Sequence, residues 1–192
     1  MKVLVRVFFI MLVAFFLSGG FSLDTVVEEP DPGCEQQERI YQLLDSLVPR
    51  MKEEYKRRLS ELVVLESQRY GYDPELVLAM ILVESSFRQR AVSPKKAVGL
   101  MQLRPHVAKA IAEELGIPLE EVEELFDPEV NINLGLFYLS KLHAEFKDLE
   151  LALIAYNYGP TYLRKRLRRG LPLPRRYATR VLRYYQEFSG GS

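Results

Sequence analysis

Residues 73–85 read DPELVLAMILVES, and this stretch predicts a helix with a defined beginning and a buried face. An Asp-Pro pair is typical of a helix start, because the first residue can cap free amides and proline fits the first helical position. Glu84 follows Ile81 by three residues and Val77 by seven. On a helix these spacings place the Glu84 carboxyl on the same face as side chains that are expected to be buried.

A carboxyl group beside an apolar wall has a raised pKa, because burial disfavours its ionised form. A raised pKa suits a general acid that protonates a leaving-group oxygen near neutral pH. Glu84 therefore has the predicted environment of a general acid. The alternative from this helix alone is a structural glutamate at a helix end, paired with Arg88 or Arg90.

Helical spacing continues on both sides of this stretch. Apolar residues recur at that spacing from Ile40 to Leu47 and from Leu59 to Leu65, and Pro49 separates the two segments. One longer loop, from residue 85 to residue 105, follows the central helix. No segment shows the sustained alternation of a strand, so we expect an all-α domain of about eight helices. Proline and glycine boundaries place the remaining helices at 105–115, 118–126, 128–146, 149–158, 161–169 and 172–188.

The N-terminal residues predict export from the cytoplasm. Residues 1–22 contain two basic residues, an apolar run at 7–17 and then small residues, which is the order found in a signal peptide. The alternative is a retained N-terminal membrane anchor. Residues 23–35 are rich in Asp, Glu, Pro and Gly and are expected to form a short linker. The working domain is then predicted to span 36–192, with an N-terminal helical extension before its catalytic part.

The composition argues against several classes of protein. Basic and acidic residues are equal in number, 26 each, so no overall positive field favours nucleic-acid binding. Cys34 is the single cysteine, which excludes an intramolecular disulfide. His106 and His143 lie far apart with no cysteine set beside them, and no glycine-rich phosphate loop is present. We therefore expect neither a metal site nor a cofactor.

Short motifs around Glu84 carry a more specific signal. In chain order they are ES with Phe87, AVSP at 91–94, GLMQL at 99–103 with Pro105, Asp127-Pro128 with NI at 131–132, and AYNYG at 155–159. Each is weak alone, but their order and spacing together resemble the soluble lytic transglycosylase family, which shares its fold with goose-type lysozyme. The resemblance runs from about residue 59 to residue 159 and implies a lysozyme-like fold.

The resemblance implies an enzyme that cuts the MurNAc-GlcNAc β-1,4 bond of peptidoglycan in the periplasm or cell wall. Glu84 would protonate the glycosidic oxygen and then act as a base toward the substrate's own 6-hydroxyl. The product would end in 1,6-anhydro-MurNAc, and no second carboxylate is needed. Two alternatives stay open: a muramidase that uses water, and a non-catalytic wall-binding or assembly protein of a secretion or flagellar machine.

Five further residues are candidates for substrate binding. Ser93 resembles the family's hydroxyl contact near the reacting sugar, although serine is also common in a turn before proline. Gln102 offers donors and an acceptor to acetamido and hydroxyl groups. Met101 is a candidate for the cleft wall, although packing in the core explains it equally well. Tyr156 matches the tyrosine expected close to the catalytic carboxyl, and Asn157 is expected to support the cleft.

Two departures from the family pattern and one charged segment complete the prediction. Arg104 stands where a second methionine is common, and residues 174–176 replace a Glu-Thr pair that often precedes a tyrosine. From Arg164 to Arg183 there are nine basic residues and no acidic one. This basic segment could contact a membrane or an anionic wall polymer. We expect a monomer whose main partner is the glycan strand.

Overall fold

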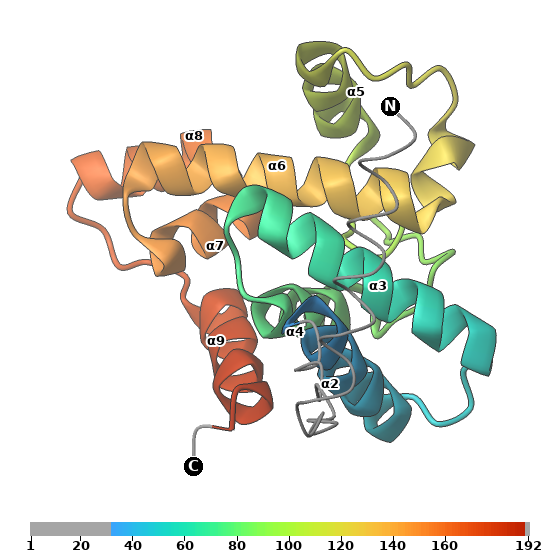
Figure 1. Ribbon diagram of the computed structural model, residues 1–192. Coiled ribbons are helices and arrows are strands. Elements are labelled where there is room, and N and C mark those ends of the chain that lie inside the picture. The colour runs from blue at the N-terminus through green and yellow to red at the C-terminus, as the bar shows by residue number, and fades with distance from the viewer. Residues whose placement is uncertain (1–31, 191–192) are drawn as a thin grey trace, which may run out of the picture. The chain divides into compact units, whose positions relative to one another are not determined.

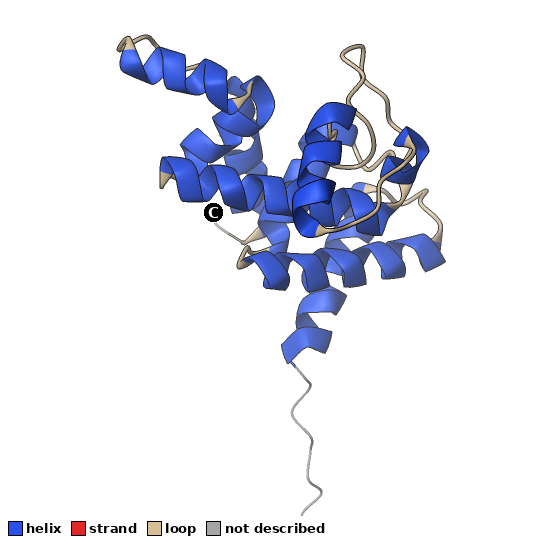
Figure 2. Cartoon of the chain, turned by 90° about the horizontal axis from the view of Figure 1, so that it is seen from above, coloured by secondary structure: helices blue, strands red, loops and turns tan. Residues whose placement is uncertain are grey.

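The computed structural model describes residues 32–190, so the predicted signal peptide and most of the predicted linker lie outside the described residues (Figure 1). This part of the chain contains eight α-helices and one 3-10 helix. Figure 2 shows only helices and loops among these residues, so the predicted all-α class is confirmed. None of its helices combines the length and hydropathy needed to cross a membrane. The elements are α2 (Pro32–Leu47), α3 (Glu53–Tyr70), α4 (Pro74–Ser85), α5 (Pro105–Leu115), η1 (Val122–Phe126), α6 (Pro128–Phe146), α7 (Leu149–Tyr158), α8 (Pro160–Arg168) and α9 (Arg176–Phe188).

Most helix ends lie where proline, glycine and aspartate predict them. Gly71 ends α3 in the left-handed conformation with φ of 69°, which only glycine adopts without strain. The Asp127 side chain accepts hydrogen bonds from the amides of Glu129 and Val130 and so caps α6. Asp73 occupies the capping position of α4, but its side chain accepts a hydrogen bond from Tyr185 of α9 instead.

Three boundaries differ from the prediction. Helix α2 begins at Pro32, so residues 32–35 belong to a helix and not to the linker. The segment at 118–126 forms only the short η1, where Glu121 and Glu124 make a reciprocal capping box. Helix α9 begins four residues after Pro172, because Leu173 precedes a second proline and is thereby disfavoured from helical conformation.

Helix α4 forms the centre of the main hydrophobic core. Every residue from Pro74 to Ile81 is buried, and α4 packs against α2, α3 and α9, which enclose it in Figure 1. A helix that is apolar on all sides is stable only in such a position. Its last turn, which carries Glu84, therefore ends at the edge of a fixed scaffold.

A smaller core lies beneath α5 and η1. It contains Leu103, Ile111, Leu125 and Leu134, and helix α6 contributes to both cores. The long loop between α4 and α5 crosses this second core, with Val98 and Leu103 buried within it. The loop is thus packed against the body of the protein on its inner side, and its outer side faces the region of Glu84.

Candidate active site

Glu84 is largely buried in the last turn of α4. Burial raises the pKa of its carboxyl from 4.5 to about 7, because the ionised form loses hydration. The Tyr177 hydroxyl and the Arg180 guanidinium, both on α9, lower the pKa in part. The Tyr177 hydroxyl is itself buried without a fully formed hydrogen bond, so it influences the carboxyl without fixing it. Glu84 can therefore be protonated near neutral pH and can also release its proton.

The ion pair between Glu84 and a neighbouring arginine does not form. The Arg88 Nε atom donates to the Ser85 carbonyl oxygen at 2.9 Å, and the Arg90 guanidinium lies 4.6 Å from the centre of the Phe126 ring. Within residues 32–190, no group of three or more His, Cys, Asp or Glu side chains is placed to hold a metal ion. Glu84 is thus not held by an ion pair with Arg88 or Arg90, which was the structural alternative to a catalytic role.

Two hollows meet at Glu84. The first, about 490 Å³, is lined by Tyr138, Tyr156 and Asn157 and is called here the tyrosine hollow. The second, about 560 Å³, is lined by Arg88 and Arg90 and is called here the arginine hollow. Both lie within the range of about 300 to 1,000 Å³ usual for ligand sites. The two share the walls Glu84, Ser93, Pro94 and Gln102, so the carboxyl stands at the boundary between two halves of one cleft.

The outer loop of the cleft is held by Asn131 of α6. Its Oδ1 accepts from the Met101 amide at 2.7 Å, and its Nδ2 donates to the Val98 and Leu125 carbonyl oxygens at 3.1 and 2.8 Å. Gly99 lies directly against this amide, and an added Cβ would come within 2.2 Å of the Asn131 Nδ2. The glycine of the Gly-Leu-Met-Gln motif therefore allows the loop to approach α6 closely.

Ser93 and Gln102 both line the cleft, as predicted from their motifs, and both also hold the loop. The Ser93 Oγ accepts from the Ala97 amide at 2.9 Å, which leaves its hydroxyl proton free to donate. The Gln102 Nε2 donates to the carbonyl oxygens of Ala91 and Gly99 at 3.2 and 2.9 Å. Its amide protons are used within the loop, so its Oε1 is the atom left to accept a hydrogen bond from a ligand.

The remaining predicted residues divide into two groups. Tyr156 and Asn157 line the tyrosine hollow from the end of α7. Asn157 stays helical, and α7 ends at Gly159, whose positive φ of 91° favours glycine. Met101 does not line the cleft: its side chain is fully buried and lies against Gly135 of α6. It acts through its backbone, whose carbonyl oxygen accepts from the Tyr156 hydroxyl at 2.9 Å, and this corrects its predicted place in the cleft wall.

The similarity of the chain to known proteins identifies its family. Residues 61–171 match the transglycosylase SLT domain. The chain belongs to this family. Membrane-bound lytic murein transglycosylase C of Edwardsiella ictaluri is 38% identical over 107 residues, which are 54% of this chain and 29% of that protein. Membrane-bound lytic murein transglycosylase E of Buchnera aphidicola is 31% identical over 139 residues, 62% of this chain and 66% of that protein. This SLT chain therefore matches less than a third of the first relative.

Solved structures confirm the lysozyme-like SLT fold. An inactive Glu-to-Gln mutant of the lytic transglycosylase Slt from Pseudomonas aeruginosa superposes with a TM-score of 0.61 at 28% identity, covering 84% of this chain and 31% of that one. The 70 kDa soluble lytic transglycosylase from Escherichia coli gives 0.62 at 25% identity, covering 82% and 30%.

Two residues of the SLT site were not predicted from the sequence. Tyr177 reaches Glu84 from α9, although the preceding Pro-Arg-Arg lacks the Glu-Thr pair common in the family. Tyr138 of α6 packs against Tyr156 with ring centres 5.3 Å apart and lines the same hollow. The sequence signal for Tyr177 is its position directly after residues 174–176, where the family pattern places a tyrosine.

The raised pKa of Glu84 predicts how the stability of this SLT domain depends on pH. The folded protein holds the proton more tightly than the unfolded chain, because the pKa rises from 4.5 to about 7. Protonated Glu84 thus adds stability below pH 4.5, and this contribution is lost as the pH rises through 7. Glu84→Gln does not lose this contribution. The free energy of unfolding of the variant, relative to that of wild type, should therefore rise by about 3 kcal/mol between about pH 4 and about pH 8. Denaturant titrations at several pH values measure this gap, and a gap independent of pH would contradict the assignment.

Proposed function

We propose that this chain is a lytic transglycosylase that cleaves the MurNAc-GlcNAc β-1,4 bond of bacterial peptidoglycan. The observation that carries the proposal is the Glu84 carboxyl, which is desolvated at the boundary of a two-sided cleft. Among residues 32–190 it is the only carboxylate that lines either hollow. A strand lying through both hollows would have its linkage beside this carboxyl. The inactive Glu-to-Gln mutant of the Pseudomonas enzyme shows that one glutamate can be indispensable in a related protein.

The proposed reaction uses one group twice. Protonated Glu84 gives its proton to the glycosidic oxygen as the C1–O bond breaks, and the GlcNAc residue leaves with a free hydroxyl. The resulting carboxylate then takes the proton from the 6-hydroxyl of MurNAc while O6 bonds to C1. Glu84 regains its proton, the 1,6-anhydro ring closes and no water is consumed. A pKa of about 7 suits both steps, because neither protonation state is strongly favoured at neutral pH.

Neighbouring residues of the cleft support these steps. We propose that Ser93 and Gln102 bind the sugars beside the linkage, since they line both hollows and retain a free donor and a free acceptor. Tyr156 and Tyr138 offer aromatic faces to a sugar ring in the tyrosine hollow, and Asn157 offers an amide at its rim. Tyr177 biases Glu84 toward ionisation and so assists its role as a base.

Digestion of purified peptidoglycan tests the proposal. The released muropeptides, weighed by mass spectrometry, should carry 1,6-anhydro ends and weigh one water less than hydrolysis products. Reducing ends would show a muramidase instead. If correctly folded wild-type protein formed neither product, the cleft would serve a wall-binding or assembly protein.

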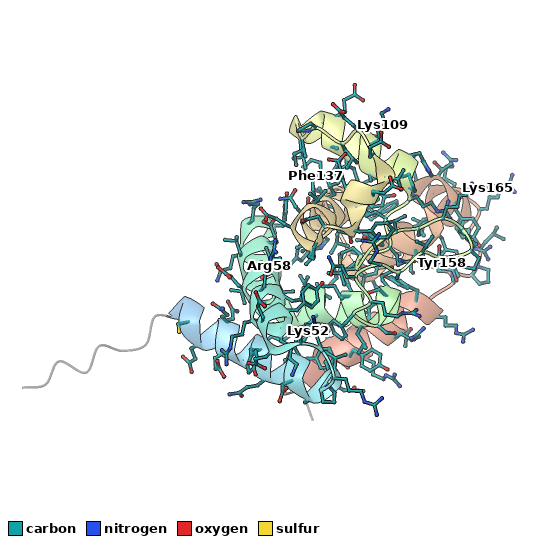
Figure 3. All side chains as sticks on the ribbon, turned by 90° about the vertical axis from the view of Figure 1, so that its right-hand side faces the viewer. Lys52, Arg58, Lys109, Phe137, Tyr158 and Lys165 are labelled. Atoms are coloured by element: carbon teal, nitrogen blue, oxygen red, sulfur yellow. The ribbon has the colours of Figure 1, made fainter. Side chains whose placement is uncertain are left out.

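A second proposal concerns the basic segment from Arg164 to Arg183. Arg164 and Arg175 form ion pairs with Glu145 and Glu150, but Lys165 has no such partner among the described residues and points away from the body of the protein in Figure 3. Leu167 and Leu171 are exposed beside it, at 43% and 41%. Exposed leucines among basic residues fit an anionic membrane or wall surface. We propose that this segment holds a monomer near the wall, outside the cytoplasmic membrane. Wild-type protein should then sediment with anionic vesicles, and Lys165→Glu should lose this sedimentation.

A further inference from the structure

The arginine hollow contains an excess of positive charge that the glycosidic reaction does not use. Arg88 and Arg90 line it, and neither forms an ion pair with any residue in 32–190. Lys95 and Arg104 add two further cations on the tyrosine side of Glu84, again without an ion pair among the described residues. Amino sugars of the glycan strand are uncharged apart from the groups attached to muramic acid. The excess charge therefore points to an anionic part of the ligand.

The two arginines are held ready for such a ligand. The Arg88 Nε atom is occupied by the Ser85 carbonyl oxygen, which leaves both terminal nitrogens of its guanidinium free to donate. The Arg90 guanidinium lies over the Phe126 ring, which restricts its position without using its N–H groups. A planar guanidinium with free terminal nitrogens binds a carboxylate through two parallel hydrogen bonds.

The backbone that carries these arginines is also fixed. The Arg88 amide donates to the Ser85 carbonyl oxygen at 3.2 Å, and the Ala91 amide donates to the Arg88 carbonyl oxygen at 3.0 Å. Between them, the Gln89 side chain donates to the Phe126 carbonyl oxygen at 2.9 Å. Phe87 is buried in the main core. Arg88 and Arg90 are both exposed on this fixed turn beside the Glu84 carboxyl, so a ligand in the arginine hollow can reach them without a rearrangement of the backbone.

We propose that Arg88 and Arg90 bind the free carboxylates of a peptide stem on the muramic acid residue that enters the arginine hollow. The enzyme would thereby favour strands that still carry stems over strands from which the stems have been removed. This inference rests on the proposed function, since it names the part of the wall polymer that the second hollow recognises. Because Arg88 and Arg90 line the same hollow as Glu84, binding of the stem carboxylates would also position the linkage for cleavage.

The test compares two substrates, glycan strands with intact stems and the same strands after amidase removal of the stems. The double variant Arg88→Gln, Arg90→Gln should lower kcat/KM for stem-bearing strands by about ten- to a hundred-fold, the usual effect of losing charge-assisted hydrogen bonds. Its kcat/KM for stripped strands should change by less than about two-fold, because no carboxylate is present there to lose. An equal loss on both substrates, or no loss on either, would overturn the proposal.

A matched control removes the same charge elsewhere. Lys52→Gln with Arg58→Gln takes two exposed cations from the start of α3, outside both hollows and away from Lys165 in Figure 3. This variant should keep the wild-type preference for stems. A binding measurement separates the inference from the proposed reaction: Glu84→Gln should bind stem-bearing fragments more tightly than stripped ones, and the arginine substitutions should abolish that difference even if no cleavage occurs.

Discussion

Glu84→Gln is expected to lower kcat/KM on peptidoglycan by about a thousand-fold or more, since general acid–base catalysis alone supplies about a hundred- to ten-thousand-fold. The amide has nearly the same shape as the carboxyl, so the cleft should keep its form. It cannot give a proton to the glycosidic oxygen and cannot take one from the 6-hydroxyl, so both halves of the proposed reaction fail. Release of soluble muropeptides from purified peptidoglycan, measured over time, checks the loss.

A second buried glutamate provides the control for this variant. Glu66 of α3 is 1% exposed, and burial raises its pKa as it does for Glu84. Its carboxyl binds the Asn133 amide at 2.9 Å and the Arg69 guanidinium at 3.1 Å, and it lines neither hollow. Glu66→Gln should therefore change stability and leave muropeptide release close to that of wild type. If Glu84→Gln retained a tenth of wild-type activity, the assignment of Glu84 would be wrong.

Asn131→Ala is expected to lower the free energy of unfolding by about 3 to 5 kcal/mol. The substitution removes one side chain and leaves the buried Met101 amide and the Leu125 carbonyl oxygen without these hydrogen bonds, whereas the Val98 carbonyl oxygen keeps the one from the Leu103 amide. The loop that carries Ser93 should then loosen, so muropeptide release should also fall. Thermal or denaturant unfolding followed by circular dichroism measures the change in stability.

The control for this effect is the same substitution at an exposed asparagine. Asn157 lies at the cleft rim, and its exposed side chain forms no hydrogen bond to any described residue, so Asn157→Ala should alter the free energy of unfolding by less than about 0.5 kcal/mol. A loss at Asn131 no larger than the loss at Asn157 would show that the loop does not depend on the Asn131 amide.

Much of the fold was predictable because its signals are local. Proline and glycine set backbone angles by their own structure, so Pro74, Gly71 and Pro128 marked helix ends without reference to the rest of the chain. The buried face of α4 followed from helical spacing alone, and the raised pKa of Glu84 followed from that face. The short η1 and the late start of α9 were harder, because each depends on a capping pair or on two prolines close together.

The parts of the site that escaped prediction depend on distant segments. Tyr177 reaches Glu84 only because α9 packs along α4, nearly a hundred residues after it in the chain. Met101 had two equal interpretations, and its place in the core was decided by the close approach of Gly135 on α6. The sequence indicated Arg88 and Arg90 only as ion-pair partners of Glu84, whereas in the structure both line the cleft and Arg90 lies over the Phe126 ring. Sequence spacing within one helix carries no information on such contacts.

The most direct test of the account is digestion of peptidoglycan by wild-type protein in water enriched in ¹⁸O, with the product ends weighed by mass spectrometry. Intramolecular attack by the 6-hydroxyl, with Glu84 as acid and then base, takes no oxygen from solvent, so the 1,6-anhydro ends should contain no ¹⁸O. Product ends that carry one ¹⁸O atom would mean that water attacks the sugar, and the claim that Glu84 directs an intramolecular reaction would be contradicted.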